Sequence, residues 1–187
     1  MGRMTRSGKR AVLATGMAAV AIAVGAVSYQ ASAAETGASA EAISPPAARS
    51  NPLIAPPDGL RILGAFGVVS GTQTYTCANK TFVGTASAPE AQLAGRSGRI
   101  HHFAGPSWQS VRDGSLITAA KIGESKVDGA IPELLLEVKT TSGTGLISKA
   151  THIQRLRTSG GTAPTAPCVD GAKKAVPYRA LYVFWGK

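Results

Sequence analysis

The residues of this 187-residue chain whose types could do chemistry lie together in one stretch, His101–Trp108 (HHFAGPSW), followed by Asp113-Gly114-Ser115. Imidazole and carboxylate groups can form an acid–base pair, and a serine hydroxyl can act as a nucleophile. A tryptophan beside polar groups can line a cleft for a small ligand. We therefore expect any chemistry of the protein near this stretch.

A metal site would have to use His101 and His102 with Asp113 and His152. Adjacent residues of a strand point to opposite faces, so the two neighbouring histidines cannot easily hold one ion. The usual zinc-ligand spacings are also absent. Ser107 lacks the Gly-x-Ser-x-Gly context of an activated nucleophile. The sequence therefore predicts no metal, no cofactor and no serine nucleophile.

Turn residues surround these groups. Gly105-Pro106 is expected to form a turn that delivers Trp108 to a strand or a cleft, because proline presets φ and glycine permits unusual geometry. Asp113-Gly114 is a strong signal for a hairpin turn. Trp108 is thus a core residue or a ligand platform, and Asp113 is a turn residue or a catalytic acid.

The sequence pattern predicts that the elements which position these residues are strands. From Asp58 to Lys187, short apolar or alternating runs are broken by Gly, Pro, Asn and Ser about every ten residues, which is typical of all-β proteins. Thr72–Cys77 alternates strictly and places Gln73, Tyr75 and Cys77 on one face. Further strands are expected at Gly59–Ala65, Thr81–Val83, Ile100–Phe103, Leu116–Ile122, Leu134–Val138, Ile153–Arg157 and Arg179–Trp185, with one short helical turn over Ala88–Leu93.

Two of these strands, at Leu134–Leu136 and Ala180–Trp185, are apolar without a polar face. Such strands are covered on both sides, or lie where a closed sheet meets a second layer. We expect a compact antiparallel barrel or sandwich of about eight to ten strands. The barrel is slightly favoured, because closure removes exposed edges.

The N-terminus predicts export. The first ten residues carry four basic side chains and no acidic one, Ala11–Val27 is uncharged, and Ala31-Ser32-Ala33 supplies small residues for cleavage after Ala33. A transmembrane helix is the alternative, but no second apolar segment of about 20 residues follows. We expect a signal peptide (1–33), a disordered linker rich in Ala, Pro and Ser (34–57) and one secreted domain (58–187).

The net charge indicates which classes of partner to expect, and the two cysteines indicate a disulfide. Removing residues 1–33 takes away four of the 20 basic residues and none of the 10 acidic ones, which leaves a net charge of +6. This balance favours an anionic cell-envelope polymer, a small ligand or a secreted protein as partner, and the scattered basic residues argue against nucleic acid. Cys77 and Cys168 are predicted to form a disulfide in an oxidising compartment.

Several motifs in a fixed order make the chain similar to a known family of secreted proteins, the domain of unknown function 3455 family of bacteria and fungi. These motifs are Pro57–Gly59, Gly71–Cys77, His102–Trp108 with Asp113–Ser115, Ala130–Pro132 with Leu134–Leu136, Gly143–Gly145, Ile153–Arg155 with Thr158–Gly161, Cys168 and Val176–Tyr182. The family has no established activity, so the resemblance implies no substrate. Glu133 departs from the family, which tends to place an aromatic residue there.

The leading hypothesis is a non-catalytic β-domain that binds an envelope component or a small ligand. Its expected ligand-binding residues are Tyr75, His102, Trp108, Asp113, Gln154 and Arg155. One alternative is a hydrolase-type enzyme that uses His102 and Asp113 as an acid–base pair. Another is a secreted protein–protein module, such as an inhibitor of a cell-wall enzyme, which rests on fold-level analogy alone.

Overall fold

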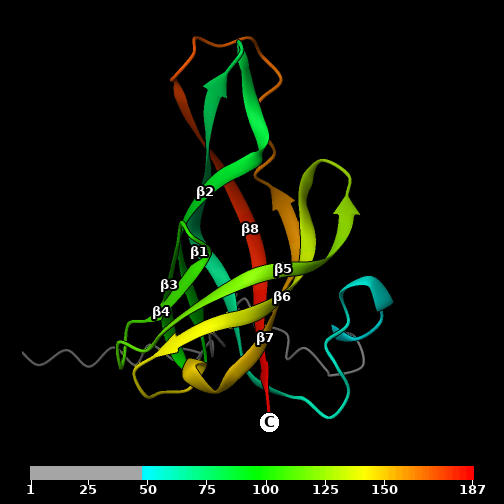
Figure 1. Ribbon diagram of the computed structural model, residues 1–187, viewed down its shortest axis with the longest axis vertical. Helices are drawn as coiled ribbons and strands as arrows, with labels where there is room; N and C mark the ends of the chain where they lie inside the picture. The colour runs from blue at the N-terminus through cyan, green and yellow to red at the C-terminus, as the bar shows by residue number, and fades with distance from the viewer. Residues whose placement is uncertain (1–47) are drawn as a thin grey trace, which may run out of the picture. The chain divides into compact units, whose positions relative to one another are not determined.

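The computed structural model describes residues 48–187, so the expected signal peptide and residues 34–47 of the expected linker lie outside the described residues. Eight antiparallel strands form a closed barrel, in which each strand pairs with the next and β8 pairs with β1 (Figure 1). This confirms the all-β expectation and decides between barrel and sandwich. The strands are β1 (Arg61–Ala78), β2 (Thr81–Gly95), β3 (Gly98–Phe103), β4 (Ser107–Ser110), β5 (Leu116–Val127), β6 (Ala130–Ser142), β7 (Ala150–Gly160) and β8 (Lys173–Gly186).

Some strands differ from the runs that predicted them. Gly59–Ala65 and Thr72–Cys77, expected as two strands, lie largely in the single strand β1, whose pairing with β2 is irregular between Val68 and Ser70. The helical turn expected at Ala88–Leu93 is wrong, because this segment pairs with β1 and β3 as part of β2. Pairing on both sides overrides a weak local preference for helix.

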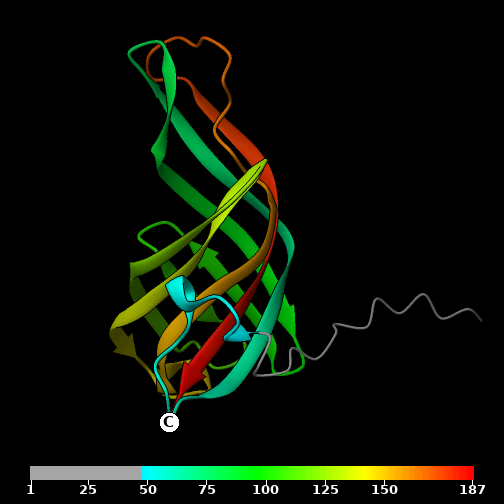
Figure 2. The same cartoon turned by 90° about the vertical axis from the view of Figure 1, so that its right-hand side faces the viewer.

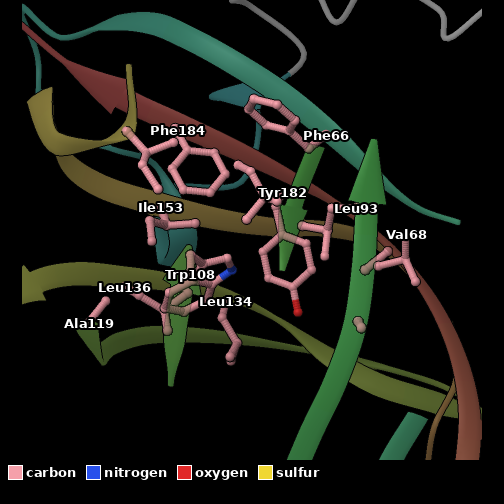
Figure 3. Packing of buried hydrophobic residues seen from close by; sticks show 14 of the residues in the cluster. Phe66, Val68, Leu93, Trp108, Ala119, Leu134, Leu136, Ile153, Tyr182 and Phe184 are labelled. Carbon is pink, nitrogen blue, oxygen red and sulfur yellow. The ribbon is translucent and has the colours of Figure 1, made fainter. Parts of the chain in front are cut away.

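All eight strands contribute buried side chains to the barrel interior. Figure 3 shows Phe66, Leu93, Trp108, Ile153 and Tyr182 converging from different strands. Phe66 also packs edge to face on Phe184, with ring centroids 5.4 Å apart. The face of β1 predicted from the alternation is buried as well. It presents Gln73, Tyr75 and Cys77.

A second hydrophobic layer covers part of the outer wall. Residues 48–60, here called the N-terminal strap, include the short 3-10 helix η1 (Pro52–Ile54) and lie against the outside of the barrel (Figure 2). Ala48 and Ile54 of the strap are buried against Leu135 and Trp185. Residues 48–57 had been expected in the disordered linker, and their few apolar side chains are enough to bind them to the wall.

The two-sided covering of β6 and β8 follows from this arrangement. Leu134 and Leu136 face the interior, whereas Leu135 between them belongs to the outer cluster. In β8, Phe184 faces inward and Val183 faces the strap side. The apolar runs in the sequence therefore mark the wall where a closed sheet meets a second layer, as predicted.

The predicted disulfide between Cys77 and Cys168 is present. It joins the end of β1 to the loop that precedes β8, where these segments extend together beyond the rest of the barrel (Figure 1). Backbone hydrogen bonds support the junction. The Cys168 amide donates to the Lys80 carbonyl, and the Cys77 amide donates to the Ala172 carbonyl.

Replacing both cysteines, Cys77→Ser and Cys168→Ser, should lower the free energy of unfolding. The bridge closes a loop of sequence separation 91, for which the chain-entropy model gives about 4 to 5 kcal/mol. Denaturant unfolding of the variant beside the wild type with and without reductant measures the loss. A loss under about 1 kcal/mol would show that the bridge adds little to pairing already made by the backbone.

The strap offers a matched pair of truncations. Ile54 is 1% exposed and its neighbour Leu53 is 66% exposed. Ile54→Ala should cost about 2 to 4 kcal/mol, as for a buried aliphatic side chain, whereas Leu53→Ala should change stability by no more than about 0.5 kcal/mol. Equal effects in urea unfolding would mean that the strap does not pack on the barrel in solution.

Candidate ligand-binding cavity

The turn between β3 and β4 places His102 directly opposite Trp108. The two residues are register partners, and Gly105 in the turn adopts φ +91°, a left-handed conformation that suits glycine. The His102 and Trp108 rings stack at 4.4 Å between centroids with 5° between their planes. Tyr182 meets both rings edge-on, at 5.1 Å from His102 and 5.9 Å from Trp108.

His102 is a neutral imidazole in this setting. Its Nδ1 lies 2.9 Å from the carbonyl oxygen of Ser107, and since a carbonyl only accepts, Nδ1 carries the hydrogen. Burial lowers the pKa of His102 from 6.5 to about 4, although the hydrogen bond to Ser107 acts in the opposite direction. The ring therefore leaves Nε2 as an acceptor at neutral pH.

A cavity of about 140 Å³ lies beside the stacked pair inside the barrel. Its buried walls are formed by Gln73, His102, Trp108, Leu134, Leu136 and Tyr182. Half-buried Pro89 and Arg155 also line it, and it reaches the surface at the exposed residues Ser87, Pro106 and Lys121. The cavity thus combines apolar walls with a few polar groups, which is the usual composition of a small-molecule site.

Two residues that line this cavity each carry a buried hydrogen-bond donor with no acceptor among the described residues. The donors are the side-chain nitrogens Gln73 Nε2 and Trp108 Nε1. Gln73 is anchored only through its other end, where Oε1 accepts from Ser87 Oγ at 2.7 Å. Because the large majority of buried polar side-chain atoms in proteins have a partner, two such donors in one cavity are a specific feature that calls for an acceptor.

Arg155 brings a positive charge to the same cavity. Its Nε and Nη2 donate to the Pro132 carbonyl at 3.0 and 2.8 Å, which fixes the guanidinium. Within the part of the chain that the structure describes, no carboxylate forms an ion pair with it. Burial raises the pKa of Tyr182, and the charge of Arg155 acts against that rise. Lys121 at the rim, in contrast, is paired with Glu124.

The structure brings together three of the six expected ligand-binding residues, His102, Trp108 and Arg155. Tyr75 is buried, but it does not line the cavity, and its hydroxyl donates to the Gly161 carbonyl. Gln154 points to the opposite face of β7, where Nε2 donates to the Ala48 and Ile54 carbonyls of the strap and Oε1 accepts from Trp185 Nε1.

Asp113 lies elsewhere, in the turn between β4 and β5 that its Asp-Gly sequence predicted. It is fully exposed, and hydrogen bonds from the Ser115 hydroxyl and backbone amide lower its pKa. It lines a separate cavity of about 450 Å³ with Arg99, Arg112 and Leu146. His102 and Asp113 therefore line different cavities and have different partners, so the structure does not assemble the acid–base pair of the hydrolase hypothesis.

The sequence did not single out two buried polar residues of the cavity, Gln73 and Tyr182, or the polar residues Ser87 and Lys121 at its rim. A signal for Gln73 was available, because the alternation of Thr72–Cys77 already put this amide on the buried face. Tyr182 carried no such signal, since it stands in a continuous apolar run. The side chains considered for a metal site, and judged unable to form one, lie as follows. His101 pairs with Glu90, and residues 48–187 contain no group of three or more metal-ligating side chains.

Glu133, the residue that departs from the family resemblance, lies outside this cavity. Its Oε1 accepts from the Arg157 amide at 2.7 Å, and it lines a small outer pocket with Ile54 and Leu156 beside the strap. Its neighbour Leu134 faces inward. A glutamate in place of an aromatic residue therefore changes the outer wall and not the cavity.

Comparison with known proteins gives one match. Residues 96–186 match the model of a family described as "Protein of unknown function (DUF3455)", which confirms the resemblance found in the sequence. The matched segment runs from the turn before β3 to the end of β8. It contains eight residues of the cavity, which are His102, Pro106, Trp108, Lys121, Leu134, Leu136, Arg155 and Tyr182. No curated protein and no solved structure matches the chain. Within residues 48–187, no helix is long and apolar enough to cross a membrane.

The buried histidine makes stability depend on pH. In the unfolded chain His102 takes up a proton near pH 6.5, whereas the native ring does so only near pH 4. The free energy of unfolding should therefore fall by up to about 3 kcal/mol as the pH drops from 6.5 to 4. Urea unfolding of the wild type and of His102→Phe between pH 6.5 and 4 tests whether His102 causes this decrease, because the variant should not show it. An identical pH dependence in both proteins would refute the assignment.

Proposed function

Because the chain belongs to the DUF3455 family, whose function is unknown, we propose a function from the cavity itself. The domain is a non-catalytic β-barrel that binds one small ligand between Trp108, Tyr182 and Arg155. The observation that carries this proposal is the pair of buried donors without an acceptor, Gln73 Nε2 and Trp108 Nε1, on two residues that line the same cavity.

The size of the barrel supports this function. An eight-stranded barrel has an interior just wide enough to be filled by side chains or to hold one small ligand. Here the interior is packed by apolar side chains such as Phe66 and Phe184, and the space beside Trp108 is left open to the rim. A polar, partly filled interior does not help the barrel to fold, because apolar side chains would fill the same space at a lower free-energy cost.

The same geometry supports binding over catalysis. The neutral His102 stacks on Trp108 and donates to the Ser107 carbonyl, so its position is that of a wall of the cavity. A proton-transfer role would be favoured by a partner carboxylate within hydrogen-bond reach and by a pKa near the working pH. His102 has a pKa of about 4, and its hydrogen bond goes to the Ser107 carbonyl and not to a carboxylate.

We further propose that the domain works outside the cell. Three observations support export: the basic and then apolar N-terminal segment, the small residues before Ala34, and the disulfide between Cys77 and Cys168. Disulfides persist in oxidising compartments and are rare in the cytosol of most organisms. An envelope component with a small terminal group is one source of such a ligand, and a free metabolite is another.

The test uses the two tryptophans of the chain as reporters. Small one-ring probes such as benzyl alcohol are titrated into ¹⁵N-labelled protein, and the indole N–H signals are followed. The Trp108 signal should shift, whereas the Trp185 signal should not, because Trp185 Nε1 is bonded to Gln154 in the outer cluster.

A pair of adjacent substitutions controls for indirect effects. Leu134→Phe fills the cavity and should abolish the shift, whereas Leu135→Phe adds the same atoms to the outer cluster and should preserve it. Thermal unfolding checks that both variants fold, since overpacking costs about 1 to 3 kcal/mol. If no probe moves the Trp108 signal in the wild type, the proposed function is wrong.

A further inference from the structure

We propose that the cavity ligand is a small monocarboxylate with an apolar body of about the size of one benzene ring. This inference rests on the proposed function, because it specifies the chemistry of the ligand that the same cavity would hold. It follows from three properties of the cavity, which are its charge, its uncompensated donors and its size.

The charge of the cavity favours an anion. Arg155 is half-buried, is held in place by the Pro132 carbonyl, and has no carboxylate partner among residues 48–187. A guanidinium in a partly desolvated site is stabilised by an anion with matching geometry, and carboxylates match it well. Lys121, the other cation at the rim, is already neutralised by Glu124. One uncompensated positive charge favours a monoanion over a phosphate dianion.

The two donors need acceptor atoms, and a carboxylate supplies acceptors without adding a donor of its own. Gln73 Nε2 and Trp108 Nε1 are both deeply buried, with their residues 2% and 1% exposed, and both lack an acceptor. In Figure 3 the indole nitrogen of Trp108 lies on the edge of the ring toward Tyr182, which lines the same cavity. An ionised carboxylate is acceptor-only and offers about four lone-pair sites, so it can serve these donors and Arg155 together.

The size and walls limit the rest of the ligand. The cavity of about 140 Å³ is close to the roughly 150 Å³ apolar cavity that holds a benzene molecule. Leu134, Leu136 and the edge of Tyr182 supply apolar contacts for such a body. A fused two-ring ligand would not fit unless part of it extended past the rim at Ser87 and Pro106.

The experiment compares benzoate with benzamide, a neutral molecule of nearly the same shape, on the wild-type protein at pH 7. Affinities come from calorimetry, and the Trp108 indole signal reports the site. Benzoate should bind about 10- to 100-fold more tightly, because hydrogen bonds to an ionised acceptor are stronger. Equal affinities would overturn the carboxylate inference and leave the proposed function standing, whereas no binding of either probe would defeat both.

Variants assign the preference to Arg155. Arg155→Gln should remove most of the preference for benzoate over benzamide, and Arg155→Lys should retain part of it. Arg96→Gln, which removes the same charge from an exposed turn, should leave both affinities unchanged. Since Arg155 also bonds Pro132, thermal unfolding is measured for each variant. A folded Arg155→Gln protein that still prefers benzoate would overturn the role of this arginine.

Gln73→Leu separates a binding role from a folding role. The Ser87 hydroxyl that Gln73 accepts from is at an exposed residue and can turn to water. Removing the orphaned amide should therefore keep or raise the melting temperature, while it weakens benzoate binding several-fold. A clear loss of stability with unchanged benzoate affinity would show that Gln73 serves the fold and would count against the inference.

Discussion

Pairing between β1 and β8 closes the sheet, and the other features of the domain depend on this closure. A closed antiparallel sheet has one inside and one outside, so the alternation of side chains along each strand assigns every residue to one of two environments. The two faces of β7 make different contacts. Arg155 lines the cavity, and its neighbour Gln154 fastens the strap to the outer wall. A slip of one residue would exchange them.

The residues that line the cavity lower the stability that closure of the barrel provides. A buried donor without an acceptor costs about 1 to 3 kcal/mol, and a histidine that must stay neutral weakens the fold at acid pH. Gln73, Trp108 and His102 impose these costs in the same region. The outer cluster, in contrast, satisfies its polar atoms, since Gln154 bonds to the strap through Nε2 and to Trp185 through Oε1. This contrast is the reason why we propose a ligand site inside the barrel.

The sequence predicts the elements of this fold better than the site. Alternation in Thr72–Cys77 and the apolar run Leu134–Leu136 depend on local pattern alone, and both were interpreted correctly. The cavity depends on which strands meet across the barrel. Local pattern could not place Arg155 inside and Gln154 outside, because both are polar residues of one strand. The short separation of His102 and Asp113 in the sequence was also misleading, because Asp113 lies in a hairpin turn and lines a different cavity. The strap was missed because one buried isoleucine among prolines gives little signal.

The two faces also explain how a substitution on the outer wall can leave the cavity unchanged. Glu133, which departs from the family resemblance drawn from the sequence, lies beside the strap and accepts a hydrogen bond from the Arg157 amide. The next residue, Leu134, is the register partner of Arg155 across β6 and β7, and both line the cavity. Because successive residues of a strand point to opposite faces of the sheet, a substitution on the outer wall changes what the barrel presents to other molecules. The charge and donors inside stay the same, so ligand chemistry and surface contacts can change independently in this fold.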